Sequence, residues 1–374
     1  MNDWMFPHFS PIIKVVSAGC NLRCKYCFYS GNQPEIMIMD EKVLGIVIDQ
    51  CLSVAPNVSF VWHGGEPTIA GIKYYQQMLR LCNELKRPGQ RVSHNIQTNG
   101  TLLDEEWADF MRNNRFSIGV SLDGPEHINN YTRVDANGRG AFSSTMRGVN
   151  ILKNANVKFG VLAVINSNSV KYPDEIFSFM YSKGLSFSAN PCTSDPSDPD
   201  SVRELAVSPM QYANFVLRLM DLWLKLEDPT FKVGPVNDLI KAVLGKQPRI
   251  CRFKGNCKRY VTIDSSGEVY PCDAFLNSKH ILGDLKRESL QNIVDNDATR
   301  MYYSGRLKII IGCGDCEWLQ ICKGGCMRTW EGEKSITDPR EYEFCQARQY
   351  LFQSVRTRLS EIGYKSSYKE KEND

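Results

Sequence analysis

The stretch I-I-K-V-V-S-A-G-C-N-L-R-C-K-Y-C, residues 12–27, joins a short β-rich run to three closely spaced cysteines. The apolar, β-branched start is typical of a buried strand. Cys20, Cys24 and Cys27 follow in a loop with the spacing Cys-x3-Cys-x2-Cys. A structural zinc site needs four ligands, and this trio has no nearby fourth cysteine or histidine. A four-iron cluster fits better, because three thiolates leave one iron free for an external ligand.

Beyond this loop, β-rich runs alternate with amphipathic helical stretches. The expected strands are residues 12–16, 58–64, 93–100, 116–124, 158–165 and 185–191, and the expected helices are 40–52, 72–87, 103–114, 143–155, 172–183 and 209–226. Strands that are each followed by a helix predict parallel βαβ units, in an α/β barrel or a doubly wound sheet. H-G-G-E-P, Q-T-N-G and S-L-D-G each close a strand, which favours an active face at the carboxyl ends of the strands.

The composition bounds the class of protein. The chain has 374 residues, of which 42% are hydrophobic and 23% charged, and its formal net charge is +3. It can bury a large core, and its balanced charge gives no reason to expect a nucleic-acid partner. The first residues lack the pattern of a signal peptide, and no apolar run is long enough to span a membrane. We therefore expect a cytoplasmic protein with no membrane association.

The fourteen cysteines divide the chain. Cys51, Cys82 and Cys192 stand alone, and we expect them to act as small core hydrophobes. Eight more gather towards the end: Cys251, Cys257, Cys272, Cys313, Cys316, Cys322, Cys326 and Cys345. Eight thiolates are the number needed for two fully ligated four-iron clusters, while zinc is the alternative because Cys-x2-Cys pairs often bind it. We predict a barrel in residues 1–235, a cysteine-rich domain in 236–350, and a C-terminal helix and polar tail in 351–374.

The front motif C-N-L-R-C-K-Y-C resembles the cluster motif of the radical SAM superfamily. The resemblance implies a partial (β/α)6 TIM-type barrel. It also implies that the open iron binds S-adenosylmethionine, which an electron from the cluster cleaves to a 5'-deoxyadenosyl radical. That radical would abstract a hydrogen atom from the substrate.

Other stretches resemble the S-adenosylmethionine-binding positions of the same superfamily. They are G-G-E-P at 64–67, Q-T-N-G-T-L at 97–102, S-L-D-G-P and N-N-Y-T-R. The candidate contacts that they supply are Gly64, Gly65, Glu66, Gln97, Asn99, Ser121 and Arg133, with Tyr26 near the adenine. Ordinary turn chemistry is the alternative for the glycines, and a solvated charge is the alternative for Arg133.

The late cysteines resemble a SPASM domain, which carries auxiliary iron–sulfur clusters. This resemblance implies that Cys251, Cys257, Cys272 and Cys326 bind one cluster, and that Cys313, Cys316, Cys322 and Cys345 bind another. With the front site, the chain would hold three 4Fe-4S clusters.

The run V-Y-P-C-D-A-F, residues 269–275, resembles that of the anaerobic sulfatase-maturating enzymes. The resemblance implies oxidation of a Ser or Cys of a sulfatase to Cα-formylglycine, with Asp273 accepting the proton from the substrate hydroxyl or thiol. The carbon radical would then lose an electron towards an auxiliary cluster. Tyr29 and His63 are further candidates for contact with the peptide, and a flavodoxin- or ferredoxin-type protein would supply electrons.

Two alternatives remain from the sequence. A maturase of ribosomally made peptides would install a thioether, a carbon–carbon crosslink or a related change by the same initial hydrogen abstraction. Many such enzymes carry an amino-terminal leader-binding domain, and the 19 residues before Cys20 are too few for one. An iron–sulfur electron carrier without catalysis is the second alternative, and the S-adenosylmethionine-type motifs argue against it.

Overall fold

The expected parallel sheet is present in the computed structural model, which describes residues 4–27, 36–194, 198–255, 257–330 and 342–364. Its first six strands are β1 (Ile12–Lys14), β2 (Asn57–His63), β3 (Arg91–Thr98), β4 (Ser117–Ser121), β5 (Phe159–Ile165) and β6 (Phe187–Pro191). Each pairs in parallel with the next in chain order. Their carboxyl ends therefore share one edge of the sheet, and the prediction of a partial barrel is confirmed.

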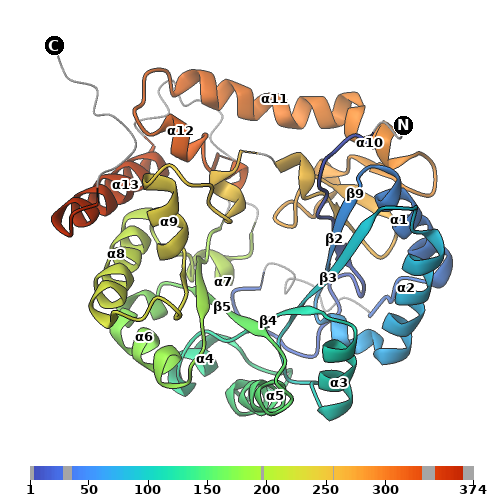
Figure 1. Cartoon of the computed structure of the whole chain (residues 1–374), viewed down its shortest axis with the longest axis horizontal. Coiled ribbons are helices and arrows are strands. Elements are labelled where there is room, and N and C mark those ends of the chain that lie inside the picture. The colour runs from blue at the N-terminus through green and yellow to red at the C-terminus, as the bar shows by residue number, and fades with distance from the viewer. Residues whose placement is uncertain (1–3, 28–35, 195–197, 256, 331–341, 365–374) are drawn as a thin grey trace.

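Helices lie outside the curved sheet, as Figure 1 shows. Six occupy the predicted stretches: α1 (Glu41–Ser53), α2 (Ile72–Leu85), α3 (Glu105–Asn113), α5 (Phe142–Asn154), α6 (Pro173–Ser182) and α8 (Pro209–Leu226). The sequence analysis did not predict the shorter α4 (Glu126–Thr132), α7 (Asp200–Arg203) and α9 (Val236–Val243). The isolated cysteines Cys51, Cys82 and Cys192 are buried, with exposed fractions of 0%, 3% and 5%, as expected of core residues.

The sheet extends beyond the barrel at both edges. The strand β7 (Val233–Gly234) pairs in parallel with β6. On the other side, β8 (Thr262–Ile263) pairs in parallel with β1 and leads into the antiparallel strands β9 (Glu268–Tyr270) and β10 (Gly283–Asp284). The strand order β10-β9-β8-β1-β2-β3-β4-β5-β6-β7 shows that the cysteine-rich region continues the barrel sheet directly.

The described part of the cysteine-rich region also contains helices. It contains α10 (Leu290–Asp295), α11 (Asp297–Gly312) and α12 (Leu319–Cys322), and α11 runs along the top of the view in Figure 1. The predicted C-terminal helix, α13 (Glu343–Glu361), begins earlier than residue 351 and packs against α8 and α9. Among the described residues, no helix combines the length and the apolar character needed to cross a bilayer.

The turn after β2 packs tightly against the loop after β1. The Gly65 amide donates to the Ser17 carbonyl (2.8 Å), and the Glu66 amide donates to the Gly19 carbonyl (2.8 Å). A Cβ atom at Gly65 would lie 2.0 Å from the Gly19 oxygen, and Gly64 has a φ of +133°. These two positions require glycine, which fixes the start of the loop that carries Cys20.

The packing of α13 can be tested at Phe352. This side chain is fully buried, and its ring centroid lies 5.4 Å from that of Phe253 and 5.6 Å from that of Trp318. Phe352→Ala should lower the free energy of unfolding by about 3–5 kcal/mol, because it leaves a cavity. Tyr350→Ala is the control on the same helix, since Tyr350 is 43% exposed. Equal shifts of the urea unfolding midpoint for the two variants would contradict this packing.

The close turn can be tested with Gly65→Ala. The added methyl group must displace the backbone of Gly19, so we expect a loss of about 1–3 kcal/mol of stability from overpacking. Gly45→Ala in α1 is the matched control, because a Cβ there meets no atom within 4 Å. It should instead stabilise the helix by about 0.5–1 kcal/mol. Thermal unfolding midpoints that move in the same direction for both variants would refute the steric argument.

Candidate active site

Three thiols lie at the carboxyl end of β1. Cys20 Sγ accepts hydrogen bonds from the Leu22 amide (3.3 Å) and from Asn99 Nδ2 (3.8 Å). Burial is the largest cause, and the nearby Cys27 a further cause, of a pKa raised to about 11 for Cys20 and to about 12 for Cys24. Buried thiols ionise readily only when a cation compensates, as iron does when thiolates bind it. The structure thus brings the three predicted cysteines together in a setting that suits a metal cluster.

Glu66 joins the ends of β2 and β3. Its carboxylate accepts hydrogen bonds from the amide and hydroxyl of Thr68, the Thr98 hydroxyl and the Asn99 amide, at 2.6–3.0 Å. Burial raises the pKa of Glu66, while these hydrogen bonds lower it. The fully buried carboxylate therefore fixes Asn99, whose Nδ2 also donates to Asn21 Oδ1 (2.9 Å) in the cysteine loop.

A buried carboxylate, Asp123, holds two predicted site residues together. Tyr26 donates its hydroxyl to Asp123 Oδ2 (2.8 Å), and Arg133 Nε donates to the same oxygen (3.0 Å). The guanidinium lies over the Tyr26 ring, 5.5 Å from its centroid. Burial raises the pKa of Tyr26 well above its usual range. Arg133 is only 6% exposed, so it is not a solvated surface charge.

Gln97 and Ser121 contact each other across neighbouring strands. Gln97 Nε2 in β3 donates to Ser121 Oγ at the end of β4 (3.0 Å). The Gln97 amide lies over Gly119, where a Cβ atom would be 2.1 Å from Gln97 Oε1. Because Gly119 has no side chain, the Gln97 side chain can lie over it and reach Ser121 at the carboxyl end of β4.

An ion pair connects β1 to the residue after Cys272. Lys14 is fully buried, and its ammonium pairs with the Asp273 carboxylate, which is 26% exposed. Lys14 Nζ also lies 3.4 Å from His63 Nδ1, an atom that accepts the Gly64 amide at 2.9 Å. Burial is the largest cause, and the nearby Lys14 a second one, of a His63 pKa lowered to about 4. The structure therefore places the predicted Asp273 and His63 around one lysine, while Tyr29 lies outside the described residues.

The late cysteines form two groups. Burial is the largest cause of the raised pKa of Cys251, Cys257 and Cys272, and Cys326 raises all three further. The other group, Cys313, Cys316, Cys322 and Cys345, lines a hollow together with Trp318, Trp330 and Phe352. These are the same two sets of four that the SPASM resemblance implies.

Nitrogen donors face the sulfur atoms in both groups. Arg306 Nη1 lies 3.5 Å from Cys257 Sγ, and Gln349 Nε2 donates to Cys345 Sγ (3.3 Å). Within the described ranges, no three histidine, cysteine or carboxylate side chains converge as they would around a single metal ion. N–H donors to ligand sulfurs are a common feature of iron–sulfur sites, where they tune the potential of the cluster. Both groups therefore fit thiolate ligation of a cluster.

The sequence analysis missed Lys14 and Asp123. The sequence contains a sign of each residue. Lys14 is a charged residue inside the apolar run I-I-K-V-V, and Asp123 belongs to the strand-end motif S-L-D-G-P. A charged residue in a buried strand needs a partner. The sequence does not show that the partner of Lys14 comes from the cysteine-rich region.

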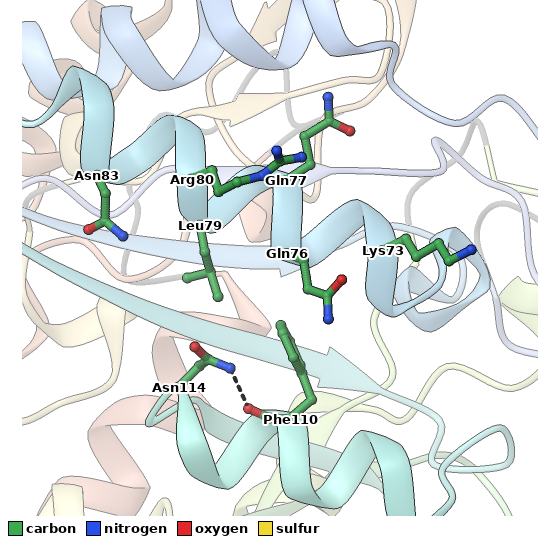
Figure 2. A pocket seen from close by; sticks show the side chains of 8 residues that line it. All are labelled: Lys73, Gln76, Gln77, Leu79, Arg80, Asn83, Phe110 and Asn114. Carbon is green, nitrogen blue, oxygen red and sulfur yellow. Dashed lines mark hydrogen bonds between the residues drawn. The ribbon is translucent and has the colours of Figure 1, made fainter.

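A separate hollow lies on the outer surface between α2 and α3. Figure 2 shows its lining, which consists of Lys73, Gln76, Gln77, Leu79, Arg80, Asn83, Phe110 and Asn114. None of the site residues predicted from the sequence lines it. We assign this surface no role in the chemistry at the strand ends.

Comparisons with known families divide the chain as its cysteines do. The model of the Radical SAM superfamily matches residues 15–180. The model of the SPASM iron-sulfur cluster-binding domain matches residues 251–327. The two matches contain the front cysteine loop and seven of the eight late cysteines, and they indicate S-adenosylmethionine and iron–sulfur clusters as cofactors.

Relatives match over nearly the whole chain. A cysteine-type anaerobic sulfatase-maturating enzyme of Clostridium novyi is 30% identical over 96% of this chain and 99% of its own. A serine-type anaerobic sulfatase-maturating enzyme of Bacteroides thetaiotaomicron is 27% identical over 92% of this chain and 88% of its own.

Two solved structures with bound peptides share the fold. The structure described as native anSMEcpe with bound AdoMet and Cp18Cys peptide has a TM-score of 0.86 and 29% identity, covering 96% of this chain and 99% of that one. Streptococcus suis SuiB bound to precursor peptide SuiA shares the fold at a TM-score of 0.64 and 19% identity, covering 91% of this chain and 76% of that one. From its sequence, its strand-end site and these relatives, the chain belongs to the SPASM-containing radical SAM enzymes, as a peptide-modifying maturase of the type that includes the anaerobic sulfatase-maturating enzymes.

Proposed function

We propose that the enzyme oxidises a cysteine or serine side chain of a sulfatase to Cα-formylglycine. The observation that carries this proposal is Asp273, a partly exposed carboxylate held at the barrel by the buried Lys14. Full-length similarity to cysteine-type and serine-type sulfatase-maturating enzymes supports the substrate class. The test is incubation with synthetic sulfatase peptides that differ only in a target Cys or Ser, followed by mass spectrometry for the aldehyde.

The proposed cofactors are three 4Fe-4S clusters and S-adenosylmethionine. Cys20, Cys24 and Cys27 would hold the first cluster and leave one iron open. The two late groups of four thiols would hold the auxiliary clusters. When bound, these groups would supply the two one-electron oxidations that convert a side-chain CH2–OH to an aldehyde, or a CH2–SH to a thioaldehyde that water then hydrolyses to the aldehyde with release of hydrogen sulfide.

The chain's own residues would bind S-adenosylmethionine along the strand ends. In this proposal the turn Gly64–Glu66 receives its amino group, and Tyr26 lies beside the adenine. Gln97, Asn99, Ser121 and Arg133 contact the ribose and the carboxylate. Arg133 meets Asp123 through Nε, and the NH2 groups of a guanidinium can pair with a carboxylate.

Asp273 would accept the proton of the substrate hydroxyl or thiol. Because a carboxylate paired with a cation accepts a proton less readily, Lys14 fixes the position of the base rather than strengthening it. His63 is neutral at pH 7, since its pKa is about 4. It can therefore contact the peptide without adding a second positive charge next to Lys14.

A peptide crosslink is the alternative outcome of the same test. A thioether or carbon–carbon bond would begin with the same hydrogen abstraction, but it would leave no aldehyde on the peptide. We propose a flavodoxin- or ferredoxin-type reductant as the electron donor for either reaction.

The front cysteines provide the first test of the mechanism. Replacing Cys20, Cys24 and Cys27 by Ala together should abolish cleavage of S-adenosylmethionine, while roughly eight irons remain per chain in two clusters. Iron analysis and chromatography of 5'-deoxyadenosine measure the two quantities. Cleavage that persists in the triple variant would refute the assignment of the front site.

The role of Asp273 can be separated from radical formation. Asp273→Asn should leave 5'-deoxyadenosine formation intact but reduce product by about 100-fold or more, because general base catalysis typically contributes 10²–10⁴-fold. Asp273→Glu is the matched variant, since it keeps a carboxylate and should restore part of the product. If the Asn variant forms as much product as the parent, Asp273 is not the base.

A further inference from the structure

Arg306 is a buried cation among the late cysteines. It lies in α11 and is only 6% exposed. Its Nη1 donates to the Gly325 carbonyl (3.0 Å) and lies 3.5 Å from Cys257 Sγ, while its Nη2 donates to the Lys323 carbonyl. Its Nε has no hydrogen-bond partner among the residues that the structure describes.

Among the residues that the structure describes, no carboxylate pairs with Arg306. Its contacts within the described residues are two carbonyl groups and a thiol. A buried charge is costly unless an opposite charge balances it. A four-iron cluster with four thiolate ligands carries net negative charge, and Cys257 belongs to the group proposed to hold such a cluster. The missing counter-charge of Arg306 and the negative charge of the proposed cluster therefore complement each other.

Arg306 also contacts both segments that position this group of thiols. The segment Lys323–Gly325 links Cys322, of one group, to Cys326, of the other, and its three residues have φ values of 49°, 78° and 71°. Backbone with these positive φ values does not continue the hydrogen bonds of a helix, so its carbonyl groups are open to other donors. Arg306 donates to two of them, those of Lys323 and Gly325. The Nη2 atom of Arg306 also lies near Gly255, where a Cβ atom would be 3.7 Å from it.

We infer that Arg306 is a positioning residue that raises the reduction potential of the first auxiliary cluster, the one proposed to be held by Cys251, Cys257, Cys272 and Cys326. Reduction adds negative charge to a cluster. A neighbouring cation and an N–H donor to a ligand sulfur both stabilise the reduced form. The inference rests on the ligand sets given under the proposed function.

The consequence concerns the second oxidation of the substrate. In the proposed function, the substrate carbon radical must give up one electron as the substrate proton moves to Asp273, and the auxiliary cluster would accept that electron. A more positive potential of that cluster makes the transfer more favourable. Arg306 thus acts on the end of the reaction without contacting the substrate.

The test measures potentials rather than turnover. The background is the enzyme with Cys20, Cys24 and Cys27 replaced by Ala, so that only auxiliary clusters contribute to a redox titration followed by electron paramagnetic resonance. Arg306→Gln should make the midpoint potential of one of the two reductive transitions about 59 mV more negative, which is about a tenfold lower ratio of reduced to oxidised cluster at a given potential. The midpoint potential of the other transition should not change. Lys308→Gln, on the exposed side of the same helix, removes the same charge and should shift neither.

The outcomes separate the inference from the proposed function. A Gln variant with full iron content and unchanged transitions would overturn the role of Arg306 alone. A background protein that binds no auxiliary clusters would overturn the ligand sets, and the inference with them. If the Gln variant loses iron, Arg306→Met replaces it. The methionine variant keeps a long side chain but no charge, so its transition must still lie below that of the parent, and an unchanged value overturns the inference.

Discussion

A fully buried lysine needs a carboxylate, and Lys14 meets Asp273 from a segment far along the chain. This ion pair can form only because β1 pairs with β2 on one side and with β8 on the other. The shared sheet places the end of β9, and therefore Asp273, beside the mouth of the barrel. Removing the charge of Asp273 would leave the buried ammonium of Lys14 without this partner, which is costly. The geometry of the whole site follows from this constraint.

Because of this pairing, the residues of the candidate site come from two regions of the chain that share one sheet. The barrel strands present the front thiols, the glycine turn and the Tyr26–Asp123–Arg133 group. The cysteine-rich region contributes Asp273 and two groups of four thiols. In the proposed function, initiation and completion of the oxidation are thus assigned to different parts of the sequence, and the pairing of β1 with β8 holds these parts side by side.

The sequence predicted the six barrel strands and their helices well, because apolar periodicity and strand-end motifs repeat over long segments. It did not reveal β7, β8 and β10, which are two residues long and carry no periodic pattern. The sequence left open whether Arg133 is a solvated charge, because only the tertiary structure shows that its side chain is buried and paired with Asp123. The sets of late thiols came from family resemblance, since spacing alone does not show that Cys326 joins Cys251 rather than Cys322. Lys14 and Arg306 are cations whose partners lie far away in the sequence, so no local pattern identifies them.

The central position of β1 has a consequence for how the protein is made. One side of this strand finds its partner in β2 soon after synthesis, but the other side waits for β8, some two hundred residues later. Until then the nascent barrel exposes an open strand edge, which can pair with another chain. The ammonium of Lys14 at the end of β1 disfavours such pairing, because burying it against another strand would leave its charge unbalanced. The residue that holds the proposed base in place would thus also disfavour pairing of this open edge with another chain.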